Sequence, residues 1–472
     1  MNRRSFMKGS LLAAGSVLAG CESLKLTSTR PAPRFRKPGE KLNIGAIGVD
    51  GKGWSDWGPM FENGENIVAL CDIDKKAIEK GLARLREKGL DKGVQVFTDY
   101  RKMLETCKNL DAVTVSTPDH IHAPAAIEAM RLGCHVYVQK PLVRTIGDAR
   151  LFQKTAREMG VVTQMGNQGS ARDGFRRGVE ILRSGILGDM TEVHVWTNRP
   201  EIEPGCEWGW KQPLDRPQGA DPIPDYLDWD SWIGPAPKRD FKAGVYHRIL
   251  WRAFYDFGTG AFGDMGCHTM NLPFRGLELG TVLKGEALEI SEHYDDTYPL
   301  FSKVCLTYAA RGKKPEVKLY WYDGYRKPHP DIMPPVVATM GAVPTTGCLI
   351  LGTKGMLVST NDYGEESYIA LKGEAKIQST SKHPACTEAL IPVTLPRAKN
   401  QDHYLEFVNA CKGEGKTFSN IDFSIPLVES MCVGCLAQRV SGKVVWDAKR
   451  CTSDNKEANR FIKPFMRKGW EY

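Results

Sequence analysis

The sequence contains no internal repeat and no low-complexity segment, so nothing in it marks a repetitive architecture. It also lacks a strong charge imbalance, because 64 lysines and arginines are interspersed with 56 aspartates and glutamates. This pattern is typical of a solvated surface, and nucleic-acid binding is not expected. The composition, with 42% hydrophobic and 25% charged residues in a chain of 472, is that of a globular protein long enough for two domains.

The cysteines lack the close, regular spacings that staple small secreted domains. Only Cys432 and Cys435 form a C-x-x-C pair, and no second pair completes a zinc site. The surrounding stretch, "FSIPLVESMCVGCLAQRV", is apolar at helical spacing. We therefore expect two small buried helix residues here, and we predict no metal site.

The first residues have the features of an export signal. Paired basic residues Arg3 and Arg4 precede an apolar run at 11–18 that is too short for a permanent membrane-spanning helix. Paired arginines followed by "SFMKG" are typical of a twin-arginine signal, a receptor-read address for folded proteins. We therefore predict that residues 1–21 are a signal and that the protein is exported.

Small residues lead directly to Cys21, and Leu18-Ala19-Gly20-Cys21 resembles a lipobox. The prediction is a bacterial lipoprotein, periplasmic or membrane-anchored, whose only membrane contact is a lipid on Cys21. A plain secretory signal with an incidental cysteine is the alternative. Residues 22–40 are polar and proline-bearing without periodicity, which suits a linker.

Short apolar runs alternate with helical patterns from residue 41 to about 165. This alternation predicts a parallel sheet covered by helices on both faces. Polar residues follow the predicted strands, where ligands bind in such sheets. From 166 to 472 we expect a second α/β domain with an open, mostly antiparallel sheet. Its aperiodic stretch at 198–245 is rich in tryptophan and proline and is expected to form an ordered wall.

The stretch "NIGAIGVDGKGWSD" has the spacing of a dinucleotide-binding turn, G-x-G-x-x-G, with Gly48 first and Gly53 last. Asp50 stands where the second glycine belongs, Gly51 still permits the turn, and Lys52 could offset the added charge. We expect a reshaped pyrophosphate contact at the helix N-terminus.

An acidic residue, Asp72, ends the next predicted strand. Its carboxylate could accept hydrogen bonds from the ribose hydroxyls of the adenosine, which favours NAD over NADP. The alternative is that Asp72 only caps the following helix, a role that Asp74 could fill equally well.

Asp264 and His268 are four residues apart, and hence on one face if their segment is helical. A histidine oriented by a carboxylate can act as a general base for a hydroxyl proton. A surface pair on a helix is the alternative, but four glycines crowd this segment, which indicates close backbone packing at a site. They are Gly258, Gly260, Gly263 and Gly266.

Together these features strongly resemble the Gfo/Idh/MocA family, named for glucose–fructose oxidoreductase, inositol dehydrogenase and a rhizopine-catabolism protein. Further stretches that carry the resemblance are "STPDHIHAPAAIEAM", Lys140-Pro141, "WIGPAPKRDF", "DFGTGAFGDMGCHTM", "ILGTKGMLV" and "MRKGWEY". The resemblance implies an N-terminal Rossmann domain that binds NAD(P), and a C-terminal α/β domain that lines the substrate pocket.

The resemblance also implies roles for individual residues. Lys140 would polarise the reacting oxygen, His268 would be the acid or base, and Asp264 would orient the histidine. Cofactor contacts are expected from a larger set that follows the first, second, fourth and fifth predicted strands. The set is Gly48, Asp50, Gly51, Lys52, Gly53, Asp72, Thr117, Pro118, His120, Gln139 and Lys140.

Gln139 departs from the family, whose Glu-Lys-Pro motif has a carboxylate at this position. The leading hypothesis is an NAD(P)-dependent oxidoreductase that acts on a carbohydrate or polyol hydroxyl with a tightly held cofactor. The alternatives are a redox-assisted NAD-dependent glycosidase or lyase, and a non-catalytic carbohydrate-binding lipoprotein. The family further implies a homo-oligomer.

Overall fold

The computed structural model describes residues 31–200, 209–292 and 294–472. The predicted signal with its lipid-bearing cysteine, and the first half of the predicted linker, lie outside these residues. Export and lipidation therefore stay predictions.

The described end of the linker, residues 31–40, contacts the first domain. The backbone N–H of Arg34 donates to the carbonyl of Gly133 (3.2 Å), and Nε of Arg36 donates to Asp111 (2.9 Å). This end of the predicted linker is therefore bound to the fold.

The first domain is the predicted parallel sheet, with six strands in the order β3-β2-β1-β4-β5-β6. Its strands are β1 (Asn43–Ile47), β2 (Asn66–Cys71), β3 (Gln95–Phe97), β4 (Ala112–Val115), β5 (His135–Val138) and β6 (Thr163–Met165). Its helices are α1 (Lys52–Glu62), α2 (Lys75–Arg86), α3 (Tyr100–Thr106), α4 (Asp119–Arg131) and α5 (Ile146–Met159). The chain reverses direction across the sheet between β1 and β4, and ligands bind at such a reversal.

The second domain contains a ten-stranded sheet in the order β14-β13-β12-β11-β7-β10-β9-β8-β15-β16. Only β7 and β10 pair in parallel among these described strands, so the predicted mostly antiparallel sheet is confirmed. The strands are β7 (Met190–Trp196), β8 (Val282–Ile290), β9 (Ser302–Tyr308), β10 (Val317–Tyr322), β11 (Gly347–Gly352), β12 (Gly355–Ser359), β13 (Ser367–Leu371), β14 (Gln378–Ser379), β15 (Lys443–Asp447) and β16 (Thr452–Ser453).

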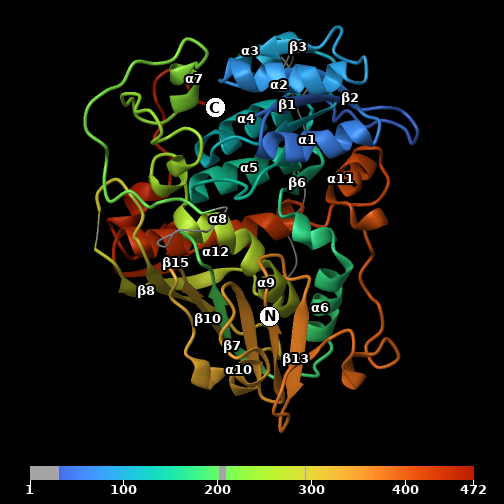
Figure 1. Cartoon of the computed structure of the whole chain (residues 1–472), viewed down its shortest axis with the longest axis vertical. Helices are drawn as coiled ribbons and strands as arrows, with labels where there is room; N and C mark the ends of the chain where they lie inside the picture. The colour runs from blue at the N-terminus through green and yellow to red at the C-terminus, as the bar shows by residue number, and fades with distance from the viewer. Residues whose placement is uncertain (1–30, 201–208, 293) are drawn as a thin grey trace, which may run out of the picture. The chain divides into compact units, whose positions relative to one another are not determined.

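The longest of the second domain's helices, α12, joins the two domains through a shared core. It packs against β8 and β9 of the large sheet and also against α5 and β6 of the first domain (Figure 1). Its length and composition would suit a membrane span, but most of it is buried inside the protein. Cys432 lies in this helix as a buried thiol and Cys435 as a partly buried one, as predicted. The helices here are α6 (Asp173–Arg183), α7 (Trp229–Ile233), α8 (Gly260–Thr269), α9 (Asn271–Leu277), α10 (Pro334–Met340), α11 (His403–Cys411) and α12 (Ile421–Arg439).

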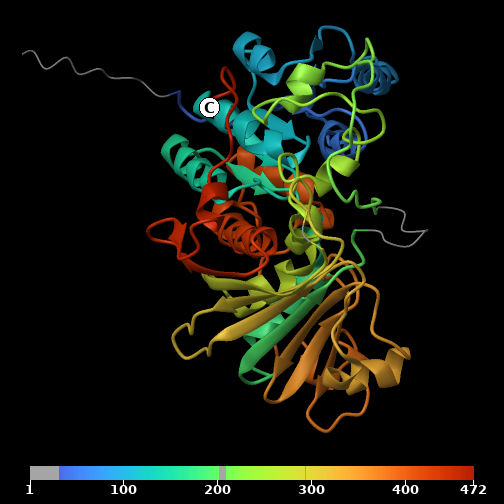
Figure 2. The same ribbon diagram turned by 90° about the vertical axis from the view of Figure 1, so that its left-hand side faces the viewer.

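Each face of the large sheet is partly covered. Side chains alternate along β7, so that Val195 joins the shared core while Trp196 joins a separate cluster with Val336 of α10. Figure 2 shows α10 beside the large sheet, on the side away from α12. This short helix buries part of the face that would otherwise be open.

Candidate active site

A cavity of about 710 Å³ lies beyond the carboxyl ends of β1, β2, β4 and β5. It continues between residues of the first domain and residues of the second, including 247–252 and the loop after β12. All the predicted site residues line it except Gly53 and His120. The residues predicted from distant parts of the sequence therefore converge on one cavity.

The glycine turn has the geometry of a phosphate cradle. Gly48 has φ of +85°, and a Cβ there would lie 2.3 Å from the carbonyl oxygen of Ser116. A Cβ on Gly53 would lie 2.2 Å from the carbonyl oxygen of Gly48. Only glycine fits at either position, and the N-terminus of α1 opens onto the cavity at Lys52. The turn therefore fits a dinucleotide, although Gly53 serves it by packing and not by lining the cavity.

Asp50 is held by cations, but not by the one that we expected. Its carboxylate pairs with Lys80 (2.7 Å), Arg84 (3.4 Å) and Arg248 (3.5 Å). Burial opposes its charge, but the hydrogen bond from Lys80 and the nearby cations hold its pKa at about 2. Lys52 does not offset this charge.

Asp72 lies at the cavity wall directly after β2. Its two oxygens accept the backbone N–H groups of Val49 (2.9 Å) and Asp74 (3.0 Å). Burial raises the pKa of Asp72 to about 6. The side chain of Asp74 caps α2 by accepting from the backbone of Lys76 (2.9 Å), so Asp72 is not the helix cap.

Asp56 of α1 is a fully buried carboxylate that was not singled out from the sequence. It accepts hydrogen bonds from Lys52 Nζ (2.6 Å), Ser116 Oγ (2.7 Å), Gln139 Nε2 (3.0 Å) and Tyr404 Oη (3.2 Å). Gln139 is thus a donor to a neighbouring carboxylate. An amide at this position satisfies Asp56, whereas a second carboxylate would repel it.

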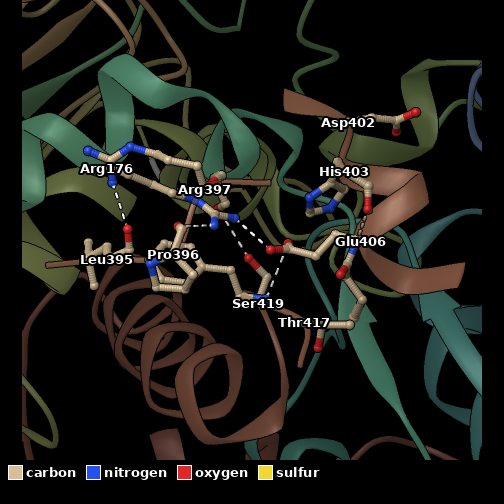
Figure 3. Close-up of polar contacts among 12 residues, drawn as sticks. Arg176, Leu395, Pro396, Arg397, Asp402, His403, Glu406, Thr417 and Ser419 are labelled. Carbon is tan, nitrogen blue, oxygen red and sulfur yellow. Dashed lines mark hydrogen bonds and ion pairs between the residues drawn. The ribbon is translucent and has the colours of Figure 1, made fainter. Parts of the chain in front are cut away.

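Tyr404 is brought to Asp56 by α11, which lies far along the chain. His403 at the start of α11 is hydrogen-bonded through Nε2 to the carbonyl of Met165 (3.0 Å). Glu406 binds the buried guanidinium of Arg176 (2.7 Å), as part of the network in Figure 3. These contacts fix α11 against β6 and so complete the cavity wall.

Lys140 and Asp264 form an ion pair across the two domains. Nζ of Lys140 lies 2.7 Å from Oδ1 of Asp264 and 2.8 Å from its carbonyl oxygen. Nε of Arg252, a residue that the sequence did not single out, lies 3.1 Å from the same Oδ1. Burial opposes the charge of Asp264, but Lys140 and Arg252 hold its pKa far below the usual range.

Helix α8 places His268 one turn after Asp264, as expected, but the carboxylate does not bind the histidine. Lys140 and Arg252 both donate to Oδ1 of Asp264, and such cations attract a carboxylate more strongly than a neutral imidazole does. Within the described residues, Nδ1 of His268 is buried without a hydrogen-bond partner. The predicted orienting role of Asp264 is therefore corrected: it positions Lys140.

His268 is a neutral imidazole at the cavity wall. Burial and the charge of Lys140 lower its pKa well below the ordinary value. The ring of Tyr363 meets it edge-on, with centroids 5.0 Å apart. Because Nδ1 is enclosed, Nε2 is the nitrogen left to receive a proton.

Thr117 and Pro118 line the cavity, but His120 does not. The imidazole of His120 is buried behind the wall, where Nε2 lies 2.9 Å from the carbonyl oxygen of Trp232. The prediction that His120 contacts the cofactor is therefore not supported by its placement. Helix α4 turns this side chain toward the aromatic wall.

The aromatic stretch forms an ordered wall where it is described. Trp229 and Trp232 stack with centroids 4.6 Å apart, and Tyr246 and Phe257 pack around them. Trp232 also lines the cavity, as does Trp251.

Two family descriptions match the chain. "Oxidoreductase family, NAD-binding Rossmann fold" matches residues 42–167, and "Oxidoreductase family, C-terminal alpha/beta domain" matches residues 178–308. Together they cover more than half of the chain. The predicted NAD cofactor and two-domain fold are confirmed by these matches.

Two curated relatives are bacterial proteins named for glycoside chemistry. A glycosyl hydrolase family 109 protein of Shewanella pealeana is 28% identical over 206 residues, which are 40% of this chain and 44% of the relative. The alpha-N-acetylgalactosaminidase of Shewanella oneidensis is 26% identical over 209 residues, with the same coverage. The matched region thus spans less than half the length of these relatives.

Solved structures share the fold. The WlbA dehydrogenase of Bordetella pertussis, in complex with NADH and UDP-GlcNAcA, is 15% identical with a TM-score of 0.57, covering 86% of this chain and 99% of that chain. An inositol dehydrogenase homologue of Azotobacter vinelandii, with NADH and myo-inositol, is 14% identical with a TM-score of 0.57, covering 88% and 99%. With its Rossmann turn, its α/β second domain and both family matches, the chain belongs to the Gfo/Idh/MocA oxidoreductase family.

Proposed function

We propose that the protein is an NAD-dependent oxidoreductase that acts on a hydroxyl group of a carbohydrate or polyol and holds its cofactor tightly. The observation that carries the proposal is the single cavity that joins the glycine turn to Lys140, Asp264 and His268. When bound there, NAD supplies a hydride acceptor or donor at its nicotinamide ring. The residues of the chain must then manage the proton and the charge on oxygen.

His268 is available to take the hydroxyl proton, because its imidazole, with a lowered pKa, is unprotonated at neutral pH. Lys140, fixed by Asp264, presents a positive charge to the same oxygen as negative charge develops on it. Arg252 shares the carboxylate and so limits the movement of Lys140. These roles divide the chemistry between a base, a cation and the group that positions the cation.

A resident cofactor follows from the predicted export, because free NAD is scarce outside the cytoplasm and a twin-arginine signal carries folded proteins. A bound cofactor then needs a closed redox cycle. Paired oxidation of one sugar and reduction of another provides such a cycle. We also infer, from the family, a homo-oligomer.

A second candidate is a redox-assisted glycosidase or lyase, which the names of the Shewanella relatives favour. In that reaction, oxidation of a ring hydroxyl would acidify the neighbouring C–H and permit elimination of the glycosidic leaving group as an alcohol. In a lyase the unsaturated sugar would be released after hydride return, whereas in a glycosidase water would first add to the double bond before the hydride is returned. The same base and cation serve both reactions. A non-catalytic sugar-binding protein is disfavoured, because it would not require Lys140, Asp264 and His268 to converge.

Denaturation of the purified protein should release NAD, detected by mass spectrometry. A screen of glycosides and polyols, with mass detection of products, should then show oxidation, and cleavage would instead establish the glycosidase. His268→Ala should lower turnover about a thousandfold, within the usual range for loss of a general base. Unchanged turnover in His268→Ala would remove the assigned mechanism.

A further inference from the structure

A segment of the second domain crosses the mouth of the first domain's dinucleotide cavity. We call residues 226–252 the strap. Its beginning is tied to the loop after β2 by main-chain hydrogen bonds. The N–H of Lys75 donates to the carbonyl of Tyr226 (2.9 Å), and the N–H of Asp228 donates to the carbonyl of Ile73 (2.8 Å).

The far end of the strap is held by charge. The guanidinium of Arg248 lies 3.5 Å from Asp50, in the glycine turn, and 3.6 Å from Asp74, after β2. Nε2 of His247 lies 3.6 Å from the same carboxylate of Asp74. One arginine of the second domain therefore bridges two separate loops of the first domain.

The strap packs against its neighbours on both sides of Arg248. Trp251 is buried, and its indole N–H donates to the carbonyl of Arg248 (2.9 Å). Tyr246, just before the charged pair, is buried against Trp229 and Phe254. Arg248 is thus displayed from a packed backbone, although its own side chain is 55% exposed.

The inner side of the strap lines the same cavity as the dinucleotide turn. His247, Arg248 and Ile249 share the cavity wall with Gly48 and Asp72. A dinucleotide held at the turn and at Asp72 would occupy the part of the cavity that these side chains close.

We propose that the strap retains the cofactor, with Arg248 as a latch across Asp50 and Asp74. The proposal rests on the proposed function, in which a resident cofactor is needed. It also assigns a role to Asp50, which stands where the turn ordinarily has glycine. Its carboxylate is one of the two that pair with Arg248. Arg248 is a positioning residue here, and the expected effect is on release of the dinucleotide.

The experiment measures the release of NADH from full-length protein loaded with NADH, by loss of its fluorescence on dilution into excess NAD. Arg248→Ala should release NADH about tenfold faster than the wild type, because lost contacts act chiefly on dissociation. Arg248→Lys, which keeps one cation, should fall between them. The matched control is Arg86→Ala, which removes an exposed pair with Asp91 on the same domain and should leave the rate unchanged.

Asp74→Ser removes one of the two carboxylates that pair with Arg248, while keeping a side chain that can cap α2. It should also speed release, and the double variant with Arg248→Ala should be no faster than Arg248→Ala alone. Release from the wild type should accelerate with salt more steeply than release from Arg248→Ala. Because the dinucleotide is itself an anion, the difference between the two salt slopes measures the latch.

An unchanged rate in folded Arg248→Ala, or equal salt slopes in the wild type and Arg248→Ala, would overturn the latch and leave the proposed function intact. Absence of dinucleotide from the purified wild type would contradict the resident cofactor, but release from NADH-loaded protein would still test the latch. The two failures are therefore distinguishable.

Discussion

The pKa of a buried carboxylate is shifted in opposite directions at the two ends of the cavity. Burial raises the pKa of Asp72, at the end of the cavity that we propose for the adenosine, to about 6, and two backbone N–H groups and, more weakly, Arg248 oppose that rise only in part. Burial acts on Asp264 at the reacting end too, but Lys140 and Arg252 reverse its effect and drive the pKa far down. Neighbouring cations, and not depth in the wall, decide which carboxylate keeps its charge.

The difference separates two tasks. The reacting end keeps a fixed arrangement of charges at neutral pH, which holds Lys140 in one place. The adenosine end keeps an acceptor whose charge changes near neutrality. Binding of the dinucleotide and the positioning of Lys140 should therefore respond differently to substitution and to pH.

Asp264→Asn removes the charged carboxylate from the reacting end of the cavity, and we expect it to have the largest effect of the three substitutions. Two cations, Lys140 and Arg252, would lose their shared carboxylate, and removal of one member of a buried ion pair costs about 3 kcal/mol of unfolding free energy. Turnover should fall about a thousandfold as Lys140 loses its position. Denaturant unfolding and steady-state kinetics measure the two effects. Asp91→Asn, at an exposed pair with Arg86, is the control and should change neither.

Gln139→Glu tests whether a buried carboxylate at the reacting end is stable without a cation of its own, because it adds a carboxylate and no cation. Nε2 of Gln139 lies 3.0 Å from Asp56, so the new charge would face a buried charge. We expect about 2 kcal/mol lower unfolding free energy. Adding Asp56→Asn to Gln139→Glu should restore most of the loss in thermal unfolding. If Gln139→Glu alone is as stable as the wild type, the Asp56 network is assigned wrongly.

Asp72→Asn tests the adenosine end and should have the smallest effect. The ionised carboxylate accepts stronger hydrogen bonds from ribose hydroxyls than the protonated form does. NAD affinity of the wild type should therefore weaken as pH falls through about 6, where Asp72 becomes protonated. Between pH 8 and pH 5 we expect about a fivefold loss by calorimetry. The pH dependence should flatten in Asp72→Asn, and an unaltered profile would show that another group controls it.

Residues at the ends of parallel strands could be predicted from sequence, since strand order alone brings Gly48, Asp72 and Lys140 to one edge. Helical spacing likewise placed Asp264 and His268 on the same helix. Their partners could not be predicted, because a carboxylate binds whichever cation the tertiary fold brings nearest. The cations at Asp264 come from elements 124 and 12 residues away.

Residues outside periodic segments were missed for a related reason. Arg248 and Arg252 lie in a stretch without helical or strand alternation, and Tyr404 reaches Asp56 across 348 residues. Asp56 itself follows Lys52 by one helical turn, which was a usable signal for a pair on α1. That the pair would be buried depended on α11, which no local pattern reveals.

Helix α12 packs between the two sheets, so the core that the two domains share is complete only after this late helix has been synthesised. Its buried face supplies the shared core, yet its last residue is Arg439. Tyr404, which closes the Asp56 network, also comes late in synthesis. A ribosome that has made only the Rossmann sheet has therefore not made a finished cavity. The Asp56 network at the wall of this cavity is complete only after α11 has been made.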